Sequence, residues 1–158
     1  MAIATKSVTI NAAFLREIKE DHLELGHAFR ETEQAFEADS LPRLSVKQMV
    51  DLLSELRDRF AMHLTLEEAF GYFEDAVDVA PRLGRRSEAL RREHEPLFLE
   101  VCALVDEAEQ LLYHEAGHHS RLRVAANFRA FVENFQAHES REKELILDAL
   151  DEDIGVGD

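Results

Sequence analysis

Hydrophobic residues recur at alternating steps of three and four positions along four stretches of the chain, the spacing that lines one face of an α-helix. Turn-forming residues interrupt this pattern at 39–42, 81–84 and 117–120. Because connections of a few residues make neighbouring helices antiparallel, the pattern predicts an all-α fold, an antiparallel up-down-up-down four-helix bundle. Residues 1–158 are expected to form one domain, with the bundle over roughly residues 10–150 and a frayed acidic tail over 151–158.

Serine residues mark two of the expected helix starts. Ser45 follows the first interruption, and Ser120 ends the third. A serine hydroxyl at this position accepts a hydrogen bond from a first-turn N–H, so both residues are predicted N-caps.

Six polar residues break the apolar stripes. Around them the stripes hold hydrophobic residues such as Leu15, Ile18, Leu25, Phe29, Phe60, Phe70, Phe131 and Phe135. The exceptions are His22 in the first stripe, His63 and Glu67 in the second, His94 in the third, and His138 and Glu142 in the fourth. The histidines lie roughly twenty residues before or after the first and third interruptions, so antiparallel helices bring all four into one layer of the core.

The two halves of the chain repeat this arrangement. A lone histidine is followed by His-x-x-x-Glu, with 41 residues from His22 to His63 and 44 from His94 to His138. The repeat predicts a pseudo-twofold axis through the bundle, and a pair of equivalent metal ions is the natural occupant of that axis.

The chemistry of these residues favours metal binding. A buried carboxylate without a partner costs several kcal/mol, so Glu67 and Glu142 are expected to face cations. His and Glu at i and i+4 reach the same point beside a helix. Each ion would receive two imidazoles, with the two carboxylates bridging the ions. Imidazole and carboxylate suit iron, zinc, manganese or nickel, and the carboxylate bridges favour a non-haem di-iron centre.

The combined pattern resembles the hemerythrin-like (HHE cation-binding) family. The residues that carry the resemblance are Asp-His22, Phe-x-x-His63-x-x-x-Glu67-Glu68, Glu-His94 and Phe-x-x-His138-x-x-x-Glu142, and the match covers roughly residues 10–150. The resemblance implies a four-helix bundle with two non-haem iron ions, bridged by carboxylates and by an oxo or hydroxo group. It assigns the four histidines as terminal ligands and the two glutamates as bridges; zinc or manganese are alternative metals.

Phe98 departs from the oxygen-carrying members of that family, which have a second histidine four residues after the one on the third helix. The six remaining ligands would leave an open position at both ions. We therefore expect a protein that binds or reacts with a small oxidant, namely oxygen, nitric oxide or peroxide, in sensing or stress response. Whether it turns over as an enzyme is left open.

Four alternatives accompany this hypothesis. They are oxygen storage or carriage, an iron-responsive regulatory module, iron-centre repair, and a metal-free or zinc-filled structural bundle. Repair is less favoured because the repair proteins of the family carry a separate N-terminal cysteine-containing domain, and no such domain is expected here.

Composition narrows the partners and the location. A formal net charge of −15 argues against nucleic acid and anionic membranes as partners. The sequence has no apolar run of transmembrane length and no signal-peptide pattern, and the single Cys102 cannot form an internal disulfide. A cytoplasmic location is expected, and the sequence does not show whether the protein has a protein partner.

Other polar residues receive simpler interpretations. His27 and Glu31 are a chance i, i+4 pair, because His27 lies far around the helix from His22. Solvent-facing positions are favoured for His114, His118, His119, Asp21, Glu93 and Glu139. Glu68 is judged equally suited to the surface and to a role beside the metal ligands.

Overall fold

The computed structural model describes residues 12–69, 80–114 and 118–155, with side chains over 20–68, 80–114 and 120–151. The long helices are α1 (Ala12–Ala35), α2 (Val46–Ala69), α4 (Gly84–His114) and α5 (His118–Gly155), and the short 3-10 helices are η1 (Leu41–Arg43) and η2 (Pro81–Leu83). No strand occurs in these ranges, so the all-α prediction is confirmed. Two sets of predictions lie outside the described side chains. They are the apolar stripe residues Leu15, Ile18 and Phe70 and the solvent-facing residues His118 and His119.

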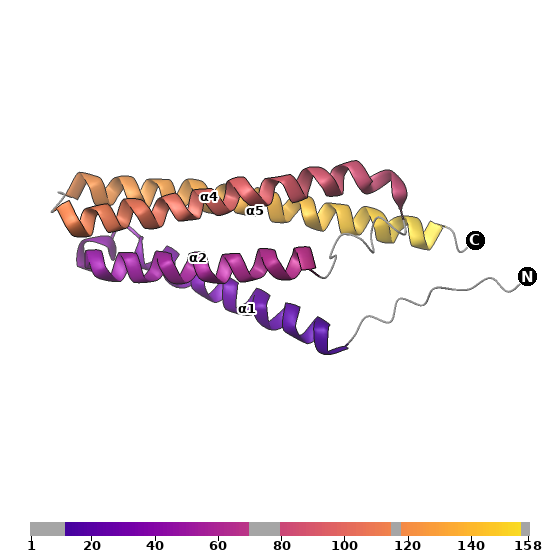
Figure 1. The fold of residues 1–158 in the computed structure, drawn as a ribbon, viewed down its shortest axis with the longest axis horizontal. Helices are drawn as coiled ribbons and strands as arrows, with labels where there is room; N and C mark the ends of the chain where they lie inside the picture. Colours follow the sequence, from indigo (N-terminus) through magenta and orange to yellow (C-terminus); the bar gives the residue numbers. More distant parts are fainter. Residues whose placement is uncertain (1–11, 70–79, 115–117, 156–158) are drawn as a thin grey trace, which may run out of the picture.

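The long helices lie alongside one another, and the chain reverses direction from each to the next (Figure 1). α2 packs against α1 on one side and α4 on the other, and α4 packs against α5. α1 diverges from its neighbours toward its N-terminal end (Figure 1).

Hydrophobic side chains form two separate buried groups. The larger draws on all four long helices and contains a block of phenylalanines in ring contact: Phe29, Phe60, Phe131 and Phe135. The smaller group is Ala80, Leu83, Leu90, Leu145 and Ala149. Along α4 and α5, the two groups are separated by the level at which the predicted histidines and glutamates occur.

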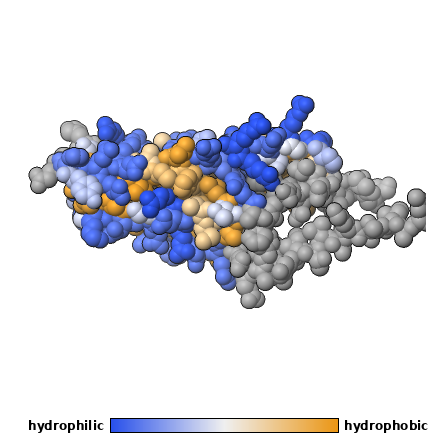
Figure 2. All heavy atoms as spheres, in the orientation of Figure 1, coloured by the Kyte–Doolittle hydropathy of each residue, from blue (hydrophilic) through white to orange (hydrophobic). Residues whose placement is uncertain are grey.

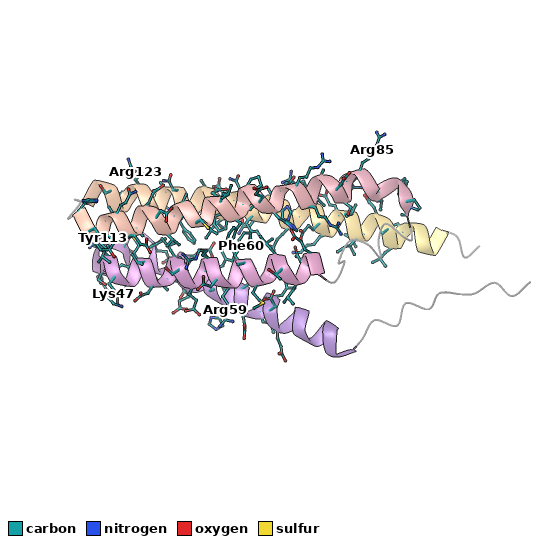
Figure 3. All side chains as sticks on the ribbon, viewed as in Figure 1. Lys47, Arg59, Phe60, Arg85, Tyr113 and Arg123 are labelled. Carbon is teal, nitrogen blue, oxygen red and sulfur yellow. The ribbon has the colours of Figure 1, made fainter. Side chains whose placement is uncertain are left out.

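The helices are amphipathic. Hydrophilic residues cover most of the described part of the face in Figure 2, and hydrophobic residues gather near its middle. Phe60 points from α2 into the interior, and the adjacent Arg59 points away from it (Figure 3). Amphipathic helices of this kind derive most of their stability from burying one face.

Helix ends match the sequence predictions in part. Ser45 precedes α2 and accepts a hydrogen bond from the N–H of Gln48, whose side chain accepts one from the N–H of Ser45, so this N-cap is confirmed. The prediction that Ser120 is an N-cap is wrong, because α5 begins at His118 and Ser120 lies inside the helix. α5 also continues to Gly155, into the segment that was expected to be frayed.

Candidate metal centre

Two groups of side chains in the bundle could each hold a metal ion. The first is His22, His63 and Glu67, and the second is His94, His138 and Glu142. Within each group the candidate ligand atoms lie within 4.8 Å of one another. The structure thus brings together, as two triplets, the six residues that the sequence singled out.

α1 and α2 supply the first triplet. Nε2 of His63 lies 2.8 Å from Oε1 of Glu67, one helical turn further along α2. The ring of His22 meets the ring of His63 edge-on, with 4.7 Å between centroids. His63 and Glu67 are buried, and His22 is the least buried of the six residues.

α4 and α5 supply the second triplet, and all three of its members are buried. Nε2 of His138 lies 2.6 Å from Oε1 of Glu142, again one turn along the helix. Nε2 of His94 lies 3.7 Å from the same oxygen, and the two imidazole rings are edge-on at 5.1 Å. The repeat in the sequence is therefore a repeat in geometry.

Glu67 connects the two triplets. Its Oε1 faces His63, and its Oε2 lies 3.5 Å from Nε2 of His94. One carboxylate thus has an oxygen toward each group, the arrangement that a bridging ligand requires. The contacts of Glu142 among the described residues are with His138 and His94, both in its own triplet.

Several buried ligand atoms at this level have no hydrogen-bond partner. They are both carboxylate oxygens of Glu67, Nε2 of His94, Nε2 of His138 and Oε1 of Glu142. The nitrogen and oxygen atoms are close to one another but are not aligned for hydrogen bonds. Buried polar atoms are nearly always satisfied, so five at one level indicate a missing partner. A cation fits them, since every atom has a lone pair available and the set is imidazole nitrogen with carboxylate oxygen.

The charges in the layer are strongly coupled. Burial opposes the charged form of His63, but the carboxylates of Glu67 and Asp21 outweigh it and raise its pKa to about 9. Burial likewise opposes the charge of His138, whose pKa is nevertheless raised by Glu142 and Glu93. Burial opposes ionisation of Glu142, but His138 and His94 lower its pKa to about 2. Protons on His63 and His138 therefore balance the neighbouring carboxylates when no metal ion does so.

A set of outer carboxylates contacts the far side of three histidine rings. Nδ1 of His63 lies 3.0 Å from Asp21, and Nδ1 of His138 lies 2.7 Å from Glu93. Nδ1 of His94 lies 3.2 Å from Oε1 of Glu68. A carboxylate that accepts the Nδ1–H of a ring leaves Nε2 free to face a metal ion.

The solvent-facing interpretation of Asp21 and Glu93 was therefore wrong. Asp21 is buried, with 9% of its surface exposed, and Glu93 is partly buried and also contacts Arg141 at 2.9 Å. The sequence contained an indication of this role, because an acidic residue directly precedes the lone histidine in both halves. Glu68 is largely exposed and nevertheless contacts His94, so both interpretations of Glu68 apply.

The remaining histidines lie apart from the two triplets. His27 is exposed and lines a groove between α1 and α2 with Glu31, Glu55 and Arg59. His114 is exposed at the end of α4. His114 agrees with its solvent-facing interpretation, and the place of His27 outside both triplets agrees with a chance pair.

Comparison with known proteins does not identify a relative: no family model, no curated protein and no solved structure gives a significant match to this chain. None of the described helices is long and apolar enough to cross a membrane.

Proposed function

We propose that this chain is a hemerythrin-like protein, an antiparallel four-helix bundle whose core holds two iron ions and reacts with a small oxidant. The observation that carries the proposal is the group of buried, unpartnered imidazole and carboxylate atoms in two adjoining triplets. Such atoms are costly to bury without a partner, and a pair of cations would satisfy them together.

Each residue has a defined part in the proposal. His22 and His63 would bind one ion, and His94 and His138 the other. Glu67 would bridge the two, which its placement between His63 and His94 supports. Glu142 would bind the second ion, and would bridge only if it moved toward the first triplet. When bound, the iron pair supplies reversible electron transfer to a small molecule.

The protein's own residues define the surroundings of this chemistry. Asp21, Glu93 and Glu68 would hold the rings so that Nε2 points inward. Phe135, 6.2 Å from the ring of His63, and Phe60 exclude water on one side of the layer. Six protein ligands shared by two ions leave positions for a small molecule, which we propose to be oxygen, nitric oxide or peroxide.

The charge of the chain supports a small neutral or diatomic ligand over a polyanion. At −15 the protein would repel nucleic acid and anionic membrane surfaces. We propose a cytoplasmic location, where reducing conditions keep iron ferrous and Cys102 free.

Metal analysis tests the proposal first. Protein purified without added metal is expected to contain close to two iron ions per chain. The His138→Ala variant should contain less iron than the wild type, and His27→Ala, which removes an exposed histidine outside both triplets, should retain the full content. Absence of bound metal from the wild type, or equal iron content in both variants, would contradict the proposal.

Reactivity distinguishes the functional alternatives. The protein is reduced without oxygen and exposed separately to oxygen, nitric oxide and peroxide while its absorbance is followed. Rapid oxidation is expected for a sensor or scavenger. A stable and reversible oxygen adduct would instead indicate oxygen storage or carriage.

An iron-responsive module is the second candidate, and the partial exposure of His22 favours it. In that case metal occupancy would control how firmly α1 packs, because metal binding and folding are linked. It predicts that removal of metal loosens α1. A metal-free form with α1 as protected from amide exchange as in the metal-loaded form would exclude it.

A further inference from the structure

The two lone histidines, His22 and His94, occupy equivalent places in the repeat but are held differently. His94 is 3% exposed, its Nδ1 contacts Glu68, and its Nε2 faces Glu67 and Glu142. His22 is partly exposed, and no hydrogen bond or ion pair links its ring to another described residue. α1, which carries His22, also diverges from the bundle toward its N-terminal end (Figure 1).

The sequence accounts for this difference. Glu68 directly follows Glu67, and the residue that directly follows Glu142 is Lys143. An ammonium group has no lone pair and cannot accept an Nδ1–H. The second half of the repeat therefore lacks the residue that would hold His22 as Glu68 holds His94.

The carboxylate partners of His63 and His138 differ in the opposite sense, because the partner of His63 in the first triplet is the better buried. Asp21 is buried, whereas Glu93 shares its charge between His138 and Arg141. Both of these histidines nevertheless have a carboxylate partner. His22 has none among the described residues, so the lone histidines make the larger difference between the two positions.

We propose that the two metal positions fill in a fixed order, with the position of His94, His138 and Glu142 first and that of His22, His63 and Glu67 second. Glu68 is the positioning residue that sets this order. It fixes the ring of His94 with Nε2 inward, whereas the ring of His22 must be ordered when metal binds. The inference rests on the proposed metal centre, and its consequence is that a scarce metal occupies one position only.

Half-centre variants test the order. His63→Ala leaves the position of His94, His138 and Glu142 intact, and His138→Ala leaves that of His22, His63 and Glu67. Each metal-free variant is titrated with Co(II) without oxygen, and the visible absorbance of Co(II) gives the dissociation constant. The position of His94 is expected to bind roughly 10-fold more tightly or better. Equal affinities, or tighter binding at the position of His22, would overturn the inference.

Variants of Glu68 test its role. Glu68→Ala should weaken Co(II) binding in the His63→Ala background by roughly 10-fold and leave it unchanged in the His138→Ala background. Glu68→Gln retains an acceptor oxygen and should restore part of the affinity. An equal loss in both backgrounds would show a general charge effect and refute the positioning role.

The converse variant supplies the missing carboxylate. Lys143→Glu in the His138→Ala background should tighten binding at His22, His63 and Glu67. Lys143→Met, which removes the charge without adding an acceptor, and Lys47→Glu, the same charge change on a distant exposed residue of α2, should have smaller effects. Equal tightening by Lys143→Glu and Lys47→Glu would contradict the proposed geometry.

The wild-type chain provides a measurement that does not depend on the folding of variants. With one equivalent of Co(II), NMR signals of His94 and His138 should be paramagnetically shifted before those of His22 and His63. Simultaneous shifts would overturn the order while leaving the two-metal centre intact. Failure of the wild type to bind two ions would instead overturn the proposed function, and this inference with it.

Discussion

The first half of the bundle, α1 and α2, and the second half, α4 and α5, carry the same His and Glu pattern in different surroundings. α4 and α5 span 31 and 38 residues, and both contribute to the smaller hydrophobic group beyond the polar layer. The repeat determines which residues face inward, and we propose that residues just outside it, such as Glu68 and Lys143, determine how firmly each lone histidine is held.

The two glutamates offer the largest test of this comparison. Glu67 faces both triplets, whereas Glu142 contacts its own. Glu67→Ala is expected to abolish stable binding of both ions, and Glu142→Ala to leave about one ion per chain. The measurement is iron content after dialysis. The same stoichiometry in both variants would show that the two carboxylates act as an equivalent pair of bridges.

The pH dependence of the metal-free protein is the next largest effect. The pKa of His63 is raised from 6.5 to about 9, so its protonated form stabilises the fold fully below pH 6.5, and this contribution is lost as the pH rises through about 9. At 1.36 kcal/mol per pKa unit the loss is about 3 kcal/mol. Urea unfolding of chelator-treated protein at both ends of this range measures it.

Two variants serve as controls for the pH effect. His63→Gln should flatten the dependence, whereas His27→Gln, on the exposed face of α1, should leave it unchanged. Stability that rises between pH 6.5 and pH 9 would contradict the predicted direction of the pH dependence.

On the acid side, the lowered pKa of Glu142 predicts a contribution to stability that is present above pH 4.5 and lost as the pH falls toward about 2.

The outer carboxylates give a smaller contrast between the halves. Asp21→Ala would leave the buried Nδ1 of His63 without a partner, at a cost of about 1–3 kcal/mol in the free energy of unfolding. The side chain of Glu93 is 31% exposed, so water can replace it, and Glu93→Ala should cost about 1 kcal/mol or less. Chemical unfolding of the two metal-free variants measures both values. Equal losses would show that Glu93 is as well shielded as Asp21.

The helical fold and the six layer residues were accessible from the sequence because both depend on periodicity. Hydrophobic residues at helical spacing identify the face of each helix that lies inward, and polar residues on that face are easily recognised. The cap at Ser45 was accessible for a similar reason, because it is a local feature.

The features that the sequence left undecided depend on relations between helices. Asp21 and Glu93 occupy positions that a single helix would expose, and their partners His63 and His138 lie on the neighbouring helices. The same is true of Glu68 and His94. The direction in which α1 diverges, and hence the partial exposure of His22, also follows from packing between helices and not from any one stretch of sequence.

The smallest expected effect concerns Gly26 in α1, which stands in the repeat where Phe98 stands in α4. Among the described residues, a Cβ at Gly26 would meet only the guanidinium of Arg30, at an ordinary 3.6 Å, so alanine fits there without strain. Because glycine is a poor helix former, Gly26→Ala should stabilise the fold by roughly 0.5–1 kcal/mol. If α1 is the weaker element, this change should also slow amide exchange in α1 more than in α4. Slower exchange in α4 alone would show that the looser half of the bundle is not the one carrying His22.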